Sequence, residues 1–241
     1  MERVRAVMRK ELREYRRNKF VVASMVILPL IFLIAPIINI LTIKPDMSAG
    51  AVRTVVAGAM LSFFLVPLFL PTVISSYAVI GERDQGTLEP VLTTPVAHEE
   101  LLLGKALAAL VPTVMLAYAL FVAFGVVARV AAQPVVSRLV WQPAQVVVIA
   151  LFSPLLGTFS IWVAQAMSVR ASDVRAAQQL SALAVLPMVG LIVLFTFRDI
   201  SPSVAVAVAG GALLAAIDAI AWRVVSRMFD RERLLTRYGR G

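Results

Sequence analysis

The chain has 241 residues, of which 60% are hydrophobic and 15% charged, and its formal net charge is +9. A soluble domain has about 45–50% apolar and about 25% charged residues, so this composition predicts an integral membrane protein rather than a free cytosolic enzyme. The chain has no cysteine and a single histidine, which excludes disulfides, zinc–thiolate sites, iron–sulfur clusters and a cysteine nucleophile.

Residues 1–19 are predicted to form an amphipathic helix. Its apolar stripe lies on one side of a helical wheel, interrupted by Glu11 and Lys19, and most of the basic residues lie on the other side. Such a helix would lie on the cytoplasmic leaflet with its cations toward anionic headgroups. The alternative is a basic tail that only fixes orientation. The residues of the stripe are Val4, Val7, Met8, Leu12 and Tyr15.

Six long apolar blocks follow, and each is long enough, or nearly so, to cross about 30 Å of hydrocarbon as a helix of roughly 20 residues. Lipid cannot satisfy backbone polar groups, so the blocks are predicted to be helical, and they are too long for the strands of a β-barrel. The first block exceeds the apolar core of a signal peptide and has no cleavage site, so it is expected to be retained. The predicted spans are 20–43, 55–80, 106–128, 144–167, 177–197 and 202–222.

The basic residues predict the orientation of these spans. If the N-terminus is cytoplasmic, 18 of the 23 Lys and Arg residues lie on the cytoplasmic side and 5 on the other. This asymmetry predicts that both termini are cytoplasmic, with residues 223–241 as a basic cytoplasmic tail. Because topology accounts for the positive charge, no nucleic-acid partner is expected.

Prolines lie inside five of the six predicted spans. Each removes a backbone hydrogen bond and tends to kink its helix. They are either pivots for movement or examples of the general frequency of proline in membrane helices. The residues are Pro29, Pro36, Pro67, Pro71, Pro112, Pro154 and Pro187.

The most informative segment, residues 81–105, connects the second and third spans. Gly86 permits a tight turn, and Glu99 and Glu100 suit the first turns of the third helix. The segment is predicted to expose Leu88 and Leu92 beside carboxylates, which suits docking to a second protein. An ordinary solvated loop is the alternative, and His98 is expected to be a solvated loop residue.

No phosphate-binding loop is found in the chain. Gly81 and Gly86 have the spacing that opens such a loop, but Thr87 and Leu88 stand where Lys and Ser or Thr are required, and no strand precedes them. The later pair of Gly104 and Lys105 has no upstream glycine at the required distance. The chain is therefore predicted to lack its own nucleotide site and not to be an enzyme by itself.

The segment after the second span also carries a recognisable pattern. Its positions are Glu82, Arg83, Gly86, Thr87, Leu88, Glu89, Leu92 and Pro95, followed by Leu103, Gly104 and Lys105. This pattern resembles the signature loop of the ABC-2 class of ATP-binding-cassette transporter permeases. Residues 171–179 resemble the second cytoplasmic loop of that family, and residues 229–235 resemble its basic tail. The six-span layout and amphipathic start agree, so the resemblance covers the whole chain.

The resemblance implies a role for each part. Residues 82–92 would form a coupling helix seated in a cleft of a separate ATPase subunit, which residues 1–19 would also contact. Two six-span copies, as a homodimer or as a heterodimer with a second permease, would form the path, and ATP and Mg would bind only in the ATPase subunits. A multi-pass protein of a prokaryotic inner membrane is implied. Some relatives have sizeable extracellular segments between the last two spans, whereas residues 198–203 here are short.

The functional hypothesis is a permease subunit that exports a hydrophobic or amphipathic compound, because few polar groups lie within the spans. The main ones are Ser62, Ser75, Ser76, Tyr77, Tyr118, Thr158, Ser160, Gln165 and Ser181.

Three alternatives remain. An ion-coupled carrier would need several buried acids, and Asp218 is the one acid within a span. An intramembrane hydrolase would need facing acids or a base near a serine, and His98 is far from any span. A non-transporting anchor for an ATPase would share the docking loop. Asp218 is thus a possible intramembrane acid, or it reaches the interface or pairs with a nearby arginine.

Overall fold

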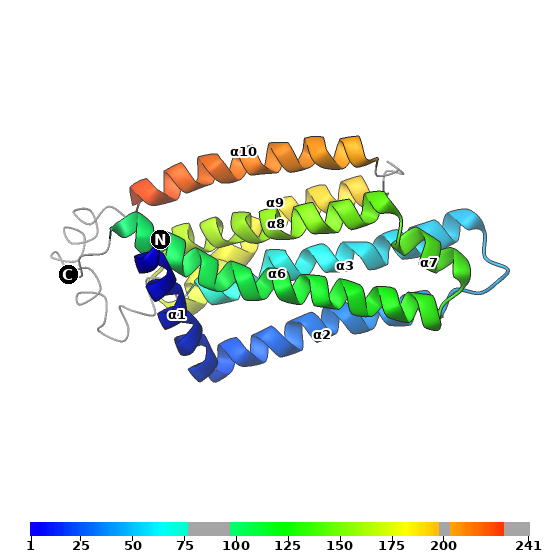
Figure 1. Cartoon of the computed structure of the whole chain (residues 1–241), viewed down its shortest axis with the longest axis horizontal. Coiled ribbons are helices and arrows are strands. Elements are labelled where there is room, and N and C mark those ends of the chain that lie inside the picture. Colours follow the sequence, from blue (N-terminus) through cyan, green and yellow to red (C-terminus); the bar gives the residue numbers. More distant parts are fainter. Residues whose placement is uncertain (77–96, 198–202, 229–241) are drawn as a thin grey trace.

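The computed structural model describes residues 1–76, 97–197 and 203–228, and within these ranges it contains helices and no strands. Six of the helices are long and apolar enough to cross a membrane, which confirms the predicted all-α membrane fold. Figure 1 shows the long helices side by side, with α1 across one end of the bundle and α7 at the other. The helices are α1 (Glu2–Arg17), α2 (Lys19–Leu41), α3 (Ala49–Ser75), α6 (His98–Val130), α7 (Pro134–Val140), α8 (Pro143–Arg170), α9 (Val174–Phe197) and α10 (Val204–Met228).

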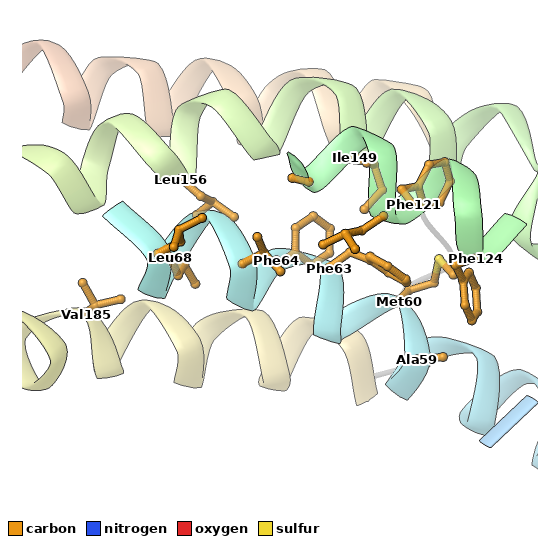
Figure 2. Packing of buried hydrophobic residues seen from close by; sticks show 14 of the residues in the cluster. Ala59, Met60, Phe63, Phe64, Leu68, Phe121, Phe124, Ile149, Leu156 and Val185 are labelled. Atoms are coloured by element: carbon orange, nitrogen blue, oxygen red, sulfur yellow. The ribbon is translucent and has the colours of Figure 1, made fainter. Parts of the chain in front are cut away.

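The centre of the bundle is α3, which packs against α2, α6, α8 and α9. Figure 2 shows part of the apolar core around α3, where Phe63 lies against Phe121 and Phe124 of α6. The Phe63 and Phe124 ring centroids are 5.0 Å apart, within the range of favourable aromatic pairs. In contrast, α10 packs mainly along α8. The large exposed apolar side chains of α2, such as Ile27 and Ile31, face outward, as expected for contact with lipid.

Several helices extend past the predicted spans because their polar ends are also helical. Helix α6 begins at His98 rather than at residue 106, with Glu99 and Glu100 in its first turn. The Glu100 carboxylate accepts a hydrogen bond of 3.1 Å from the Ala97 N–H. The predicted loop therefore ends earlier, and Lys105 is a helical residue. Helix α3 likewise begins at Ala49 and α10 continues to Met228.

The short helix α7 lies in what was expected to be a connecting segment. Its first residue is Pro134, whose fixed φ and missing N–H suit the first turn of a helix. The Gln133 side chain donates a hydrogen bond of 2.9 Å to the Ile43 carbonyl, which joins this segment to the α2–α3 connection. The seven prolines of the predicted spans all lie inside α2, α3, α6, α8 and α9, which continue through them.

Trp141, directly after α7, packs closely on Gly125 of α6. Its indole N–H donates a hydrogen bond of 3.2 Å to the Gly125 carbonyl. A Cβ atom added at Gly125 would lie 2.4 Å from the Trp141 ring, far inside van der Waals contact. Glycine at this position therefore lets α7 and the Trp141 ring close over α6.

Gly125→Ala is expected to destabilise the protein by about 1–3 kcal/mol, because the ring and its hydrogen bond must shift. The matched control is Gly58→Ala on α3, where no atom lies within 4 Å of an added Cβ, so the change should be neutral or slightly stabilising. Thermal unfolding of both variants in detergent measures the difference. Equal melting temperatures would show that the Trp141 contact is not tight.

Candidate functional site

The candidate site is the end of the bundle that carries α1, called here the proximal end; the end that carries α7 is the distal end (Figure 1). The described chain stops at residue 76 and resumes at residue 97, at the end of α3 and the start of α6. The predicted coupling-loop residues therefore lie outside the described residues. They are Glu82, Arg83, Gly86, Thr87, Leu88, Glu89, Leu92 and Pro95.

Helix α1 packs on the start of α6 and, to a lesser extent, on α2. Val4 is buried, and Val7, Met8, Leu12 and Tyr15 are half-buried, so the stripe named from the sequence is the covered face of α1. A Cβ atom added at Gly104 would lie 2.6 Å from the Cβ of Val7. Gly104, part of the family-like motif, thus permits the close approach of α1 to α6.

A buried ion pair joins the same two helices. The Lys105 ammonium lies 2.9 Å from a carboxylate oxygen of Glu11, and the two residues are only 4% and 5% exposed. Lys10 also approaches Glu11, at 3.3 Å. In the sequence Glu11 is an interruption of the apolar stripe, but in the structure it is the partner of Lys105. The pairing was missed because it spans 94 residues of chain.

The environment of Glu11 keeps its carboxylate charged. Burial raises the pKa of Glu11, but the charges and hydrogen bonds of Lys105 and Lys10 together lower it more, so the pKa lies below its usual 4.5. A buried pair of this kind is expensive to break, since removal of one partner leaves a charge in a poorly solvated place.

Asn18 fixes the corner between α1 and α2. Its side-chain oxygen accepts hydrogen bonds from the N–H groups of Phe20 and Val21, at 3.0 and 3.3 Å. This cap satisfies donors at the start of α2, which otherwise have no partner within the helix. The first span therefore begins directly after α1, and the two helices meet with a defined geometry.

The connection between α8 and α9, which resembles the family's second cytoplasmic loop, also lies at the proximal end. The Asp173 carboxylate accepts a 2.9 Å hydrogen bond from the Ala176 N–H at the start of α9, and this bond lowers the pKa of Asp173. The Ser168 hydroxyl donates to the Ser76 carbonyl at 3.0 Å. That bond ties α8 to the end of α3, immediately before residue 77.

The polar residues named for the spans lie mostly between helices. Ser75, Ser76, Ser160, Gln165 and Ser181 are buried. Both polar atoms of the Gln165 amide lack a hydrogen-bond partner in the part of the chain that the structure describes. Two others bond to neighbouring carbonyls: Tyr118 donates to Ala150 on α8, and Thr158 donates to Pro154.

Asp218 lies on the face of α10 that is buried with Leu214 and Val225. It is 7% exposed, and neither carboxylate oxygen has a hydrogen-bond partner among the described residues. The expected pairing with an arginine is therefore not seen in the described ranges. Because α10 continues to Met228, Asp218 also lies farther from the helix end than the position of Arg223 suggests.

Comparison with known proteins identifies one family. A family model described as "ABC-2 family transporter protein" matches residues 5–222, a range that begins within α1 and ends within α10. No curated protein matches the chain.

Lys105→Met is expected to destabilise the protein by about 3 kcal/mol, the lower end for a broken buried pair, because Lys10 still approaches Glu11. The double variant Glu11→Met/Lys105→Met should recover most of this loss, since an apolar pair of similar volume can replace a buried ion pair. Thermal unfolding and the rate of tryptic cleavage within α1 report the effect. A double variant as unstable as Lys105→Met would contradict the pairing.

The docking of α1 is also expected to depend on pH in acid only. Because the pKa of Glu11 is lowered on folding, its stabilising contribution is present above 4.5 and is lost as the pH falls through the lower, folded value. Trypsin is inactive at such an acid pH, so the measurement is the protection of the α1 amides from hydrogen exchange. Protection should be constant from about pH 6 to 8, once corrected for intrinsic exchange, and should be lost progressively as the pH falls below 4.5. The same loss in Glu11→Gln would assign it to another group.

Proposed function

The chain belongs to the ABC-2 transporter family and is a membrane subunit of an ABC transporter; we propose that it is the permease of an ATP-driven exporter coupled to a separate ATPase subunit. The single observation that supports the coupling is the buried Glu11–Lys105 pair at the proximal end. It joins α1 to the start of α6, the helix that follows residues 77–96 in the chain, and that segment carries the family's docking signature.

At the proximal end, chain connections and side-chain contacts link α3, α6, α1 and α2 in turn. The segment of residues 77–96 joins α3 directly to α6. From α6 the Glu11–Lys105 pair leads to α1, and the Asn18 cap leads on to α2. An ATPase that binds residues 82–92 and moves on ATP binding would therefore displace α3 and α6 together. Through the contacts of α6 with α1, this movement would also displace α1 and the first span, α2.

ATP bound by a separate subunit is the proposed energy source for transport. The chain carries no phosphate-binding loop, so ATP and Mg would be bound by two partner ATPase subunits. Two permease copies, identical or related, would enclose the path. The bundle would lie in a prokaryotic inner membrane with the proximal end and both termini in the cytoplasm.

A hydrophobic or amphipathic cargo is the proposed substrate class. The apolar spans predicted from the sequence contain one acid, Asp218, and their other polar side chains are hydroxyl and amide groups. A charged cargo would need paired opposite charges within the membrane, since an isolated charge in hydrocarbon is costly. A drug, lipid or lipopeptide needs no such groups.

The buried carboxyl of Asp218 supports one competing function, an ion-coupled carrier. Such carriers pass ions between several polar groups, whereas Asp218 has no hydrogen-bond partner in the described ranges. A single isolated acid favours a structural role. The remaining alternative is a membrane anchor for an ATPase that transports nothing. Only a measurement of transported cargo distinguishes such an anchor from a permease.

Charge reversal in the coupling segment, Glu82→Lys or Glu89→Lys, is expected to weaken ATPase docking and abolish coupled export while the protein still inserts. The control Asp46→Lys makes the same charge change in the α2–α3 connection, at the distal end, and should leave docking unchanged. Co-purification of the ATPase and ATP-dependent transport in vesicles are measured. Normal assembly and export in both loop variants would refute the docking role, and ATP hydrolysis by the chain alone would refute the division of labour.

Asp218→Asn is expected to leave transport largely intact, because the substitution keeps the shape of a side chain that holds no partner in the described structure. ATP-driven uptake into inverted vesicles, with and without an imposed proton gradient, is the measurement. An abrupt loss of transport in a normally folded variant would instead favour ion coupling through this carboxyl.

A further inference from the structure

A cavity of about 360 Å³ lies between α3, α8, α9 and α10 in the distal half of the bundle. Its volume is in the range of small-molecule sites. Buried residues form its floor: Met60 of α3 is 3% exposed and Leu156 of α8 is 1% exposed. The rim is open, since Leu191 of α9 is 50% exposed and Leu213 of α10 is 66% exposed. The cavity thus opens sideways, between two helices that have at most marginal contact with each other.

The cavity follows from the way α10 packs. Gly211 permits α10 to lie close on α8, where an added Cβ would be 2.3 Å from the Leu151 side chain. Its neighbour Gly210 lines the cavity, so no side chain projects from that position into the space. Helix α9 packs on the other side, against α3 and α8. Helices α9 and α10 therefore stand apart, and α3 and α8 form the floor of the space between them.

The polarity of the lining runs in one direction. Of the described residues that line the cavity, only Gln145 and Thr196 have polar side chains, and none is charged. Gln145 is the third residue of α8 and Thr196 the penultimate residue of α9, so both lie at the distal end. Everything deeper, down to Leu156 and Ile217, is apolar. The cavity therefore has a polar mouth and a dry, apolar interior.

The length of the cavity matches half a bilayer. Gln145 and Leu156 are eleven residues apart on one helix, which is about 16 Å at 1.5 Å per residue. One leaflet contributes about 15 Å of the hydrocarbon thickness. A chain that enters from the adjacent leaflet would thus reach from the headgroup level to the middle of the membrane.

We propose that this cavity binds one acyl chain of a phospholipid from the adjacent leaflet, with the ester region of the lipid at Gln145 and Thr196. An acyl chain is uncharged, as the lining requires. The lipids of the surrounding bilayer lie directly at the open rim of the cavity, so an acyl chain is always available there. The ester carbonyls can accept a hydrogen bond from the Gln145 amide. The proposal is independent of transport, because it needs neither ATP nor an ATPase.

The test uses the full-length chain in vesicles of phosphatidylcholine doped with a phosphatidylcholine that carries a diazirine near the end of one acyl chain. After irradiation, labelled residues are identified by mass spectrometry. Label is expected on the floor residues Met60 and Leu156, which the ordinary lipid shell cannot reach because they are buried. Label confined to exposed faces, such as Ile27 and Ile31 of α2, would overturn the proposal.

Matched variants on α10 separate occupancy from general contact with lipid. Val206 and Val208 are 52% and 53% exposed, but only Val206 is among the residues that line the cavity. Val206→Trp should reduce floor labelling severalfold, and Val208→Trp should leave it unchanged. Ala57→Phe fills the cavity from α3 and provides a second blocking variant if Val206→Trp fails to fold. Equal labelling in blocked and control proteins would overturn the proposal, as would a cysteine cross-link showing a second copy seated in the cavity.

Discussion

The constraint on which the whole structure depends is that hydrocarbon offers no hydrogen bonds to a backbone. Every block of about twenty apolar residues must therefore satisfy its own N–H and C=O groups, and the helix is the local way to do so. The same constraint makes the few polar side chains in the spans turn inward, as Ser160 and Gln165 do. Packing of α3 against α2, α6, α8 and α9 then holds the helices in place.

The two ends of the bundle are built from different chemistry. At the proximal end, ionic and capping interactions hold the pieces: Glu11 with Lys105, Asn18 at the start of α2, and Asp173 at the start of α9. At the distal end, Trp141 packs over Gly125 and donates a hydrogen bond to its carbonyl, and Gln133 bonds to the Ile43 carbonyl; no ion pair is seen there among the described residues. A force applied at the proximal end would therefore act on the helices through this ion pair and these capping hydrogen bonds, each of which joins specific partners. In the distal half, the laterally open cavity lies between α9 and α10.

The interior of the bundle distinguishes the functional hypotheses more clearly than the sequence does. Asp218 is buried on α10 without a hydrogen-bond partner among the described residues, so no relay of polar groups leads to or from it there. The laterally open cavity, in contrast, has an apolar interior and no charged side chain among its described lining residues. A bundle with this interior is suited to contact with lipid-like molecules, and the family assignment makes the chain a membrane subunit of an ABC transporter.

The sequence by itself determined the fold class, the number of spans and the family, because each depends on local composition or on a short motif. Helix ends were predicted less well: α6 starts at His98, since polar helical turns have no apolar signature. The helix α7 was not anticipated because its seven residues are too few for a helical periodicity to be read from the sequence. Only the tertiary structure decided that Glu11 pairs with Lys105, that Gly104 receives Val7, and that α9 and α10 leave a cavity between them. These features join residues far apart in the chain, and periodicity within one helix shows which face is apolar but not which neighbour it meets.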